Sequence, residues 1–180
     1  PGNRLAVMTN GIGVGMLALD RLVDLGGERA ALSETTLETL DAALPRGWSR
    51  RNAVDMLGDA DGPRYAATLA ALLQDRDNDA ILVMNVPTVL SSPPEVARAV
   101  VETLRAHPRE AARKPVFGVL VGEHPEARRI LADAGVHAFT SEAGAVRGFM
   151  YLVRHQQAQR ALMETPPSLP DDFNVDVAGA

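Results

Sequence analysis

The run of apolar residues from Ala80 to Val86, AILVMNV, constrains the fold more than any other part of the sequence. Apolar and polar residues do not alternate in it, so a strand formed here would be buried on both of its faces. Strands of that kind occur in parallel sheets, which are covered by helices on both sides. The run therefore predicts an α/β protein.

Shorter apolar runs predict four further strands, at residues 5–8, 30–32, 116–121 and 137–139. The segments between them carry apolar residues at helical spacing and predict helices over 15–26, 33–44, 63–73, 93–106, 126–134 and 142–163. Ser33 and Ser141 are expected to cap the helices that follow them. Strands and helices that alternate in this way form a parallel sheet with right-handed crossovers. We expect a flavodoxin-like three-layer α/β/α domain with a five-stranded parallel sheet over residues 1–163.

Composition and charge exclude several classes of protein. The sequence has no cysteine, which excludes disulfides, thiolate metal sites and a cysteine nucleophile. Its 18 Lys and Arg and 23 Asp and Glu residues give a formal net charge of −5, whereas nucleic-acid-binding proteins usually have a basic excess. No apolar run approaches the length of about 20 residues that a membrane helix needs. We therefore expect a cytoplasmic domain that binds neither nucleic acid nor a membrane.

Both ends of the chain have the composition of linkers. The chain starts Pro1-Gly2-Asn3, without a methionine, and residues 164–180 are rich in proline and acidic residues. We expect residues 164–180 to be a linker and the chain to be one domain of a longer polypeptide.

The strongest local motif, here named the glycine motif, lies between the first predicted strand and the first predicted helix. It consists of Asn10, Gly11, Ile12, Gly13, Val14 and Gly15. Glycines at alternate positions let the backbone approach a ligand closely and adopt positive φ. A helix that begins near Gly15 would add free N–H groups and the positive end of its dipole. The spacing fits neither a dinucleotide-binding fingerprint nor a Walker A loop. The motif therefore predicts either a phosphate site or a tight turn that packs closely and binds nothing.

A set of segments in a fixed order along the chain gives a more specific signal. They are residues 3–11 (NRLAVMTNG), 32–36 (LSETT), 52–60 (NAVDMLGDA), 79–83, 114–116 and 127–129. In this order they resemble the second, C-terminal CoA-ligase domain of the NDP-forming acyl-CoA synthetases, the superfamily of ADP-forming acetate–CoA ligases and succinyl-CoA synthetases. Residues 163–167 (METPP) are similar to the linker that leads into the ATP-grasp domain of bacterial single-chain members. The resemblance covers essentially the whole chain.

The resemblance implies a part in a larger enzyme. Such enzymes convert a carboxylate, CoA and ATP into acyl-CoA, ADP and phosphate, through an acyl phosphate and a phosphohistidine. The domain that this chain resembles contributes a helix N-terminus that helps to hold the transferred phosphate. That role maps onto the glycine motif. CoA, ATP or ADP, and Mg would be bound elsewhere in the parent enzyme, and no cofactor is expected in this chain.

The remaining candidate residues carry weaker signals. Asn52 and Asp55 lie in the least regular stretch, residues 46–62, where we expect them to order a loop that faces the glycine motif. The acidic residues of that stretch lack the spacing of an EF-hand, so we expect no metal site. None of the four histidines, His107, His124, His137 and His155, lies in a phosphohistidine-like sequence. We therefore expect no catalytic residue in the chain.

The expected partners are the other domains of the same polypeptide: the CoA-binding domain, the first ligase domain and the ATP-grasp domain. The chain alone should then be inactive, and a surface that those domains cover should let it form a homodimer. Two alternatives remain open. The chain could be the non-catalytic or regulatory body of a protein lysine acetyltransferase, or a free-standing flavodoxin-like protein that binds a small phosphorylated ligand.

Overall fold

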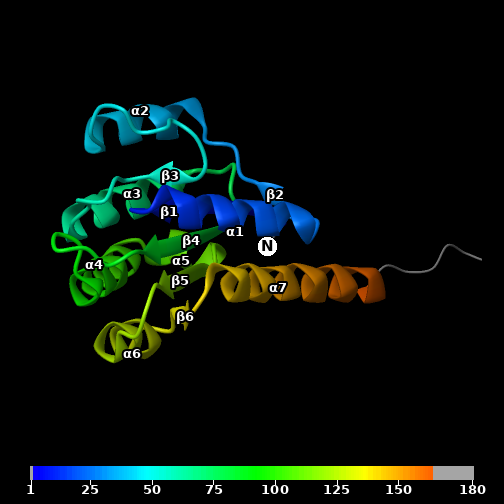
Figure 1. Cartoon of the computed structure of the whole chain (residues 1–180). Helices are drawn as coiled ribbons and strands as arrows, with labels where there is room; N and C mark the ends of the chain where they lie inside the picture. Colours follow the sequence, from blue (N-terminus) through cyan, green and yellow to red (C-terminus); the bar gives the residue numbers. More distant parts are fainter. Residues whose placement is uncertain (1, 164–180) are drawn as a thin grey trace, which may run out of the picture.

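The run that begins at Ala80 forms β4 (Ala80–Asn85), which lies in the middle of a parallel sheet, and all six of its residues are buried. This is the arrangement in the computed structural model, which describes residues 2–163 (Figure 1). The predicted linker at 164–180 lies outside the described residues. The sheet order is β2-β1-β4-β5-β6, from β1 (Arg4–Thr9), β2 (Glu28–Arg29), β5 (Val116–Leu120) and β6 (His137–Phe139). The predicted α/β fold with a parallel sheet is confirmed.

The sheet has six strands rather than the five expected. The additional strand, β3 (Val54–Asp55), pairs with the end of β1 through Met8 and Thr9. Strand β2 pairs with the start of β1 and lies at Glu28–Arg29 instead of the predicted 30–32. Both strands have two residues, which is too short for an apolar period to appear in the sequence.

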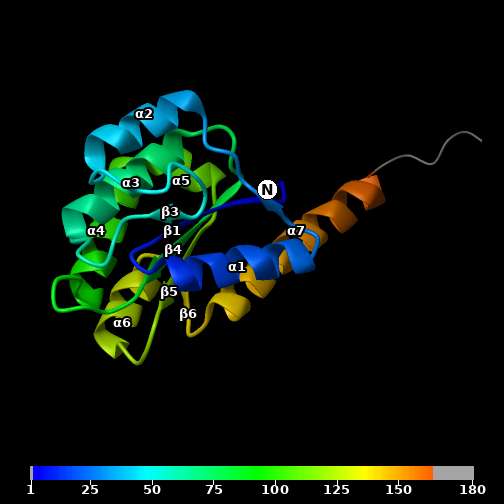
Figure 2. The same cartoon turned by 45° about the horizontal axis from the view of Figure 1, so that its top comes forward.

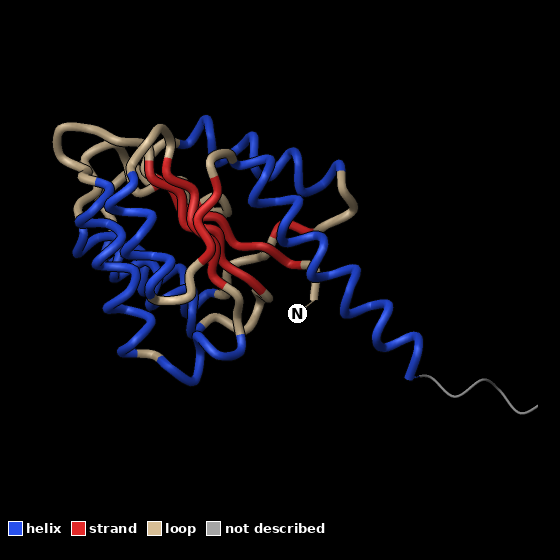
Figure 3. Tube along the Cα trace, turned by 90° about the horizontal axis from the view of Figure 1, so that it is seen from below, coloured by secondary structure: helices blue, strands red, loops and turns tan. Residues whose placement is uncertain are grey.

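Helices cover both faces of the sheet. On one face lie α1 (Ile12–Asp24) and α7 (Glu142–Met163), which pack side by side (Figure 2). The other face carries α2 (Glu34–Ala43), α3 (Gly62–Gln74), α4 (Pro93–Ala106) and α6 (Pro125–Asp133). A short helix that the sequence did not predict, α5 (Pro108–Arg113), connects α4 to β5. Seen along the sheet, the strands lie between two groups of helices (Figure 3), which is the expected three-layer arrangement.

Alternate residues of each central strand enter separate cores. In β1, Ala6 and Met8 belong to the core under α2, α3, α4 and α6, whereas Leu5 and Val7 belong to the core under α1 and α7. The C-terminal half of α7 extends beyond both cores (Figures 1 and 2), and Leu162 is 86% exposed. No helix within residues 2–163 is long and apolar enough to cross a membrane.

The predicted helix caps are confirmed. The Ser33 hydroxyl accepts a hydrogen bond from the Thr36 amide, and the Ser141 hydroxyl accepts one from the Gly144 amide. Gly26 follows α1 with φ +82°, and Gly27 N–H donates to the Leu22 carbonyl. That bond pattern is a Schellman motif, which places glycine at the left-handed position.

Asn52 fills the break between β2 and β3 along the edge of β1. Its Nδ2 donates to the carbonyls of Leu5 and Ala30, both within 3.1 Å, and its Oδ1 accepts from the Val7 amide at 2.8 Å. The side chain thus pairs with the middle of β1, where neither short strand reaches.

At the amino-terminal edge of the sheet, an ion pair joins the start of β1 to the start of β4. Arg4 donates to both carboxylate oxygens of Asp79, through Nε at 2.9 Å and Nη2 at 3.1 Å. Burial by itself raises the pKa of Asp79, but the hydrogen bonds and charge of Arg4 outweigh it and hold that pKa below its usual value.

We expect Asn52→Ala to lower the free energy of unfolding by about 2–4 kcal/mol, because it leaves backbone groups of β1 without partners. Urea denaturation measures the change. The matched control is Asn3→Ala, which removes one exposed hydrogen bond to Glu28 and should change stability by less than about 0.5 kcal/mol. Equal effects of the two substitutions would contradict the bridging role.

The Arg4–Asp79 pair predicts an acid-dependent loss of stability. A carboxylate whose folded pKa is depressed stabilises the fold above its unfolded pKa, about 3.9, and loses that contribution as the pH falls through the folded pKa. Asp79→Asn should therefore cost about 1 kcal/mol at pH 7, and its difference from the unmodified chain should shrink below about pH 4. Urea denaturation at both pH values tests this, with Asp77→Asn, a half-exposed carboxylate near Arg4, as the control.

Candidate functional site

The carboxyl ends of β1 and β4 form the position in this sheet where ligands are expected. β1 is flanked by β2 and β3 on one edge and by β4 on the other, so the chain reverses its direction of winding between them. In open α/β sheets, ligands bind outside the carboxyl ends of the strands at such a reversal. Two segments leave the sheet at this position: the glycine motif after β1 and residues 86–92 after β4, here named the β4 loop.

The glycine motif differs in one respect from its prediction. Helix α1 begins at Ile12, not near Gly15, and Gly11 is its N-cap with extended backbone angles (φ −139°, ψ 91°). Gly13 and Gly15 therefore lie in the first helical turn. None of the three glycines is among the described residues with positive φ. The alternation of glycines indicated a turn, but helical angles are open to glycine as well, and the chain enters the helix at once.

The start of α1 leaves two backbone donors free. Gly11 N–H donates to the Thr9 hydroxyl at 3.0 Å, and the amides of Val14 and Gly15 donate to the Gly11 carbonyl. Within residues 2–163, the N–H groups of Ile12 and Gly13 have no hydrogen-bond partner. No side chain caps the helix, and its first turn has no acidic residue. These donors lie at the positive end of a 13-residue helix dipole, an arrangement that favours an anion.

Close packing explains two of the three glycines of the motif. A Cβ on Gly11 would lie 2.6 Å from a methyl group of Val86, and a Cβ on Gly15 would lie 2.8 Å from the Thr9 methyl group. Packing therefore requires glycine at both positions. A Cβ on Gly13 would meet no heavy atom within 4 Å. Gly13 is thus the one glycine of the motif that close packing does not explain.

Asn10 is buried and its side chain bonds within the protein. Its Nδ2 donates to the Val86 carbonyl at 2.8 Å, and its Oδ1 accepts from the Val86 amide at 2.8 Å. Tyr65, on α3, lies with its hydroxyl 3.0 Å from the same Oδ1. Burial raises the pKa of Tyr65 above its usual value, so the phenol stays protonated.

Asn85 and Ser91 complete this buried polar cluster, which has no motif of its own in the sequence. Asn85 Nδ2 lies 2.9 Å from the Ser91 hydroxyl and 3.2 Å from the Tyr65 hydroxyl. One signal could have revealed it. Asn85 is the single polar residue in the run AILVMNV, and a polar residue buried there requires partners.

The structure separates the two residues of the expected supporting loop. Asp55 lies in β3 opposite Thr9, beside the glycine motif, and its carboxylate accepts a hydrogen bond from the Leu57 amide at 3.0 Å. Asn52 contacts the middle of β1 instead. The other acidic residues of the loop stabilise turns and ends, since Asp61 caps α3 and Asp59 pairs with Arg64. No group of three His, Asp or Glu residues that could hold a metal occurs in the described chain.

The histidines lie apart from the glycine motif. His107 ends α4, with Nδ1 3.0 Å from the Thr103 carbonyl, and His137 packs edge-on against Phe139. His124 lies at the carboxyl end of β5, with Nε2 3.0 Å from the Val121 carbonyl. It lines a cavity of about 530 Å³ together with Glu123, Arg128 and Thr140.

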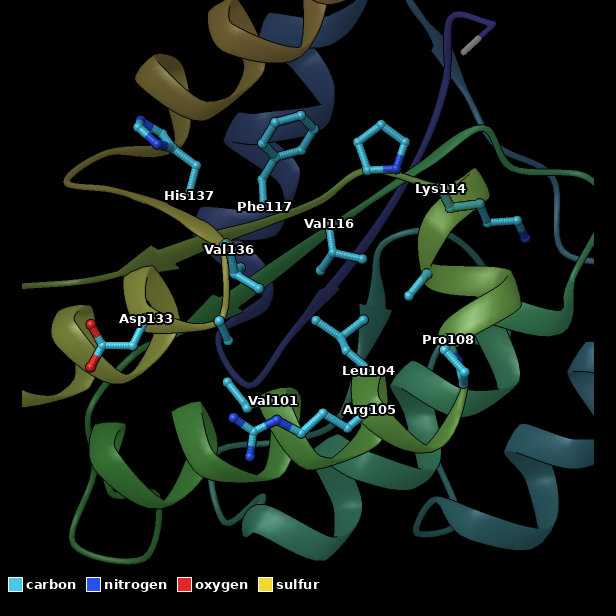
Figure 4. Close-up of a pocket in the computed structure, with 14 residues that line it drawn as sticks. Val101, Leu104, Arg105, Pro108, Lys114, Val116, Phe117, Asp133, Val136 and His137 are labelled. Atoms are coloured by element: carbon cyan, nitrogen blue, oxygen red, sulfur yellow. The ribbon is translucent and has the colours of Figure 1, made fainter.

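A larger cavity, of about 660 Å³, opens at the opposite, amino-terminal edge of the sheet (Figure 4). Val101, Leu104, Val116 and Val136 give it an apolar floor. The Lys114 ammonium at its margin donates to the carbonyls of Leu72 and Asp75, which are at the end of α3, and burial lowers the pKa of Lys114. The Lys114 ammonium is therefore already hydrogen-bonded to the protein backbone.

Comparison with protein-family models finds no match for the chain. Among individual proteins, the chain is 33% identical over 142 residues to the α subunit of ADP-forming acetate–CoA ligase II of Pyrococcus furiosus, covering 77% of this chain and 30% of that subunit. It is 30% identical over 154 residues to ADP-forming acetate–CoA ligase I of Archaeoglobus fulgidus, covering 85% of this chain and 21% of that protein.

A solved structure of an acetyl-coenzyme A synthetase is also similar to this chain. The dinucleotide-forming acetyl-coenzyme A synthetase 1 of Ca. Korarchaeum cryptofilum, in complex with phosphate and ADP, superposes with a TM-score of 0.78 at 26% identity. The match covers 90% of this chain and 35% of that one. The chain thus spans about a third or less of the length of the proteins it matches. Over most of its length, this chain is homologous to one part of the ADP-forming acetate–CoA ligases, in the NDP-forming acyl-CoA synthetase family.

Proposed function

We propose that this chain acts as a ligase domain of an ADP-forming acyl-CoA synthetase and that the start of α1 helps to bind the transferred phosphate. The observation that carries the proposal is the pair of free N–H groups at Ile12 and Gly13, at the start of an uncapped helix. Their place at the carboxyl ends of β1 and β4 supports it, since ligands bind there in related sheets. The phosphate and ADP in the Korarchaeum structure belong to a homologue and make this ligand class a reasonable one to test.

The chemistry of the reaction would lie outside this chain. The glycine motif has no Lys or Arg, so it would supply hydrogen bonds and a dipole but no full positive charge. CoA, ADP or ATP, and Mg would be held by other domains of the same polypeptide, in the cytoplasm. The chain would therefore contribute a binding group, not a catalytic residue, and its affinity for phosphate alone would be weak.

The first test is a titration with inorganic phosphate followed by amide NMR. We expect the Ile12 and Gly13 amide resonances to shift, because their N–H groups are free to donate to the anion. Chloride at equal ionic strength is the control. If amides far from α1 shift while those of Ile12 and Gly13 do not, the glycine motif is a turn that binds nothing.

Gly13→Val makes the test specific to the site. A Cβ at this position meets no heavy atom within 4 Å, so the free energy of unfolding should change by less than about 1 kcal/mol while the phosphate response is lost. Leu17→Val, at a position on the same helix that is 59% exposed, is the matched control and should keep the response. An unchanged titration in Gly13→Val would exclude the start of α1 as the site.

We also expect the isolated chain to associate with itself through the outer surface of α1 and α7. Eight large apolar side chains are exposed on these adjacent helices: Ile12, Met16, Leu17, Val23, Tyr151, Leu152, Leu162 and Met163. In a larger enzyme another domain would cover such a surface. Light scattering should give a mass that rises with concentration, and Leu17→Glu should reduce it. The mass of the monomer at all concentrations would contradict this expectation.

A further inference from the structure

The Tyr65 hydroxyl contacts the residue that starts the glycine motif and the residue directly before the β4 loop. It is fully buried and lies 3.0 Å from Asn10 Oδ1, at the start of the glycine motif. It also lies 3.2 Å from Asn85 Nδ2 and 2.9 Å from the Met84 carbonyl, both in β4. A phenol hydroxyl has one proton, so it donates toward the two acceptors, Asn10 Oδ1 and the Met84 carbonyl, and accepts from the Asn85 amide.

Each asparagine holds one end of the β4 loop. Asn10 forms two hydrogen bonds with the backbone of Val86, where the loop begins. Its Nδ2 donates to the Val86 carbonyl, and its Oδ1 accepts from the Val86 amide. These two bonds join β1 and β4 beyond the last pair of their ladder, Thr9 with Met84. Asn85 donates to the hydroxyl of Ser91, which is fully buried near the end of the loop. Both anchors of the loop therefore contact the Tyr65 hydroxyl.

Within the loop, Thr88 and Ser91 form an isolated antiparallel β-bridge. Thr88 also donates from its hydroxyl to the Gly58 carbonyl at 2.9 Å, whereas Val89 and Leu90 at the tip are largely exposed. The start of the loop is close to the glycine motif, because the Val86 side chain occupies the space beside Gly11. A change in the anchors would therefore alter the position of Val86 beside Gly11, the residue that precedes the free N–H groups of Ile12 and Gly13.

We propose that the Tyr65 hydroxyl is a positioning group for the phosphate site, which holds the β4 loop at a fixed distance from the start of α1. The inference rests on the proposed function, because it assumes that the Ile12 and Gly13 amides bind phosphate. A phenylalanine would fill the same space in the core, so packing alone does not require the hydroxyl. Its three polar contacts, with Asn10, Met84 and Asn85, account for it, and two of them are with the side chains that anchor the β4 loop.

The test compares Tyr65→Phe with Thr68→Val, which lies one turn further along α3. Each substitution removes one fully buried hydroxyl, but the Thr68 hydroxyl has no hydrogen-bond partner among the described residues. Hydrogen exchange is measured at the amide of Val86, which donates to Asn10, and at the amide of Val83, within β4. Phosphate titrations of the Ile12 and Gly13 amides are recorded for the same proteins.

We expect Tyr65→Phe to speed exchange at Val86 about three- to tenfold more than at Val83, because one hydrogen bond of the anchor is lost. The phosphate midpoint should rise by a similar factor. Thr68→Val should change neither the ratio of the exchange rates at Val86 and Val83 nor the phosphate midpoint. A purely structural role for Tyr65 would speed exchange at both amides equally, because both would then report global unfolding.

Two results would overturn the proposal, and they are distinguishable. If the unmodified chain binds phosphate and Tyr65→Phe binds it with the midpoint of Thr68→Val, the hydroxyl does not position the site and the proposed function stands. If the unmodified chain shows no phosphate response at Ile12 and Gly13, the proposed function fails, and this inference fails with it before any variant is compared.

Discussion

The pairing of β1 on both of its edges is the interaction on which the rest of the structure depends. β4 runs along one edge from Leu5 to Thr9, while β2 and β3 share the other edge. A buried strand with an unpaired edge would leave polar backbone groups without partners, at a cost of about 1–3 kcal/mol each. Asn52 provides partners in the gap between the two short strands, so β1 is buried and almost fully bonded.

The same use of asparagine recurs at the carboxyl end of β1. Where the β1–β4 ladder stops, Asn10 continues it with a side-chain amide that bonds to both backbone groups of Val86. The chain on each side can then leave the sheet, one part into α1 and the other into the β4 loop. Side-chain amides thus allow a short sheet to end in two segments that are held close together.

This arrangement explains how the fold could expose a binding group without giving up stability. The glycines at 11 and 15 let the chain turn tightly against Val86 and Thr9, so α1 begins directly after β1. The N–H groups of Ile12 and Gly13 then have no hydrogen-bond partner among the described residues. Under the proposed function, cationic groups from another domain would supply the positive charge that the glycine motif lacks.

The sequence by itself determined the α/β class, the positions of the long helices, the central strands and the caps at Ser33 and Ser141, because each has a local signal in periodicity or end residues. The order of the family-like segments along the chain also pointed to the acyl-CoA synthetases from the sequence alone. Only the tertiary structure decided the two-residue strands β2 and β3, the start of α1 at Ile12 and the cluster around Tyr65. These features depend on hydrogen bonds between residues far apart in the chain, such as Asn10 and Val86, and such pairings leave no period or spacing in a single sequence.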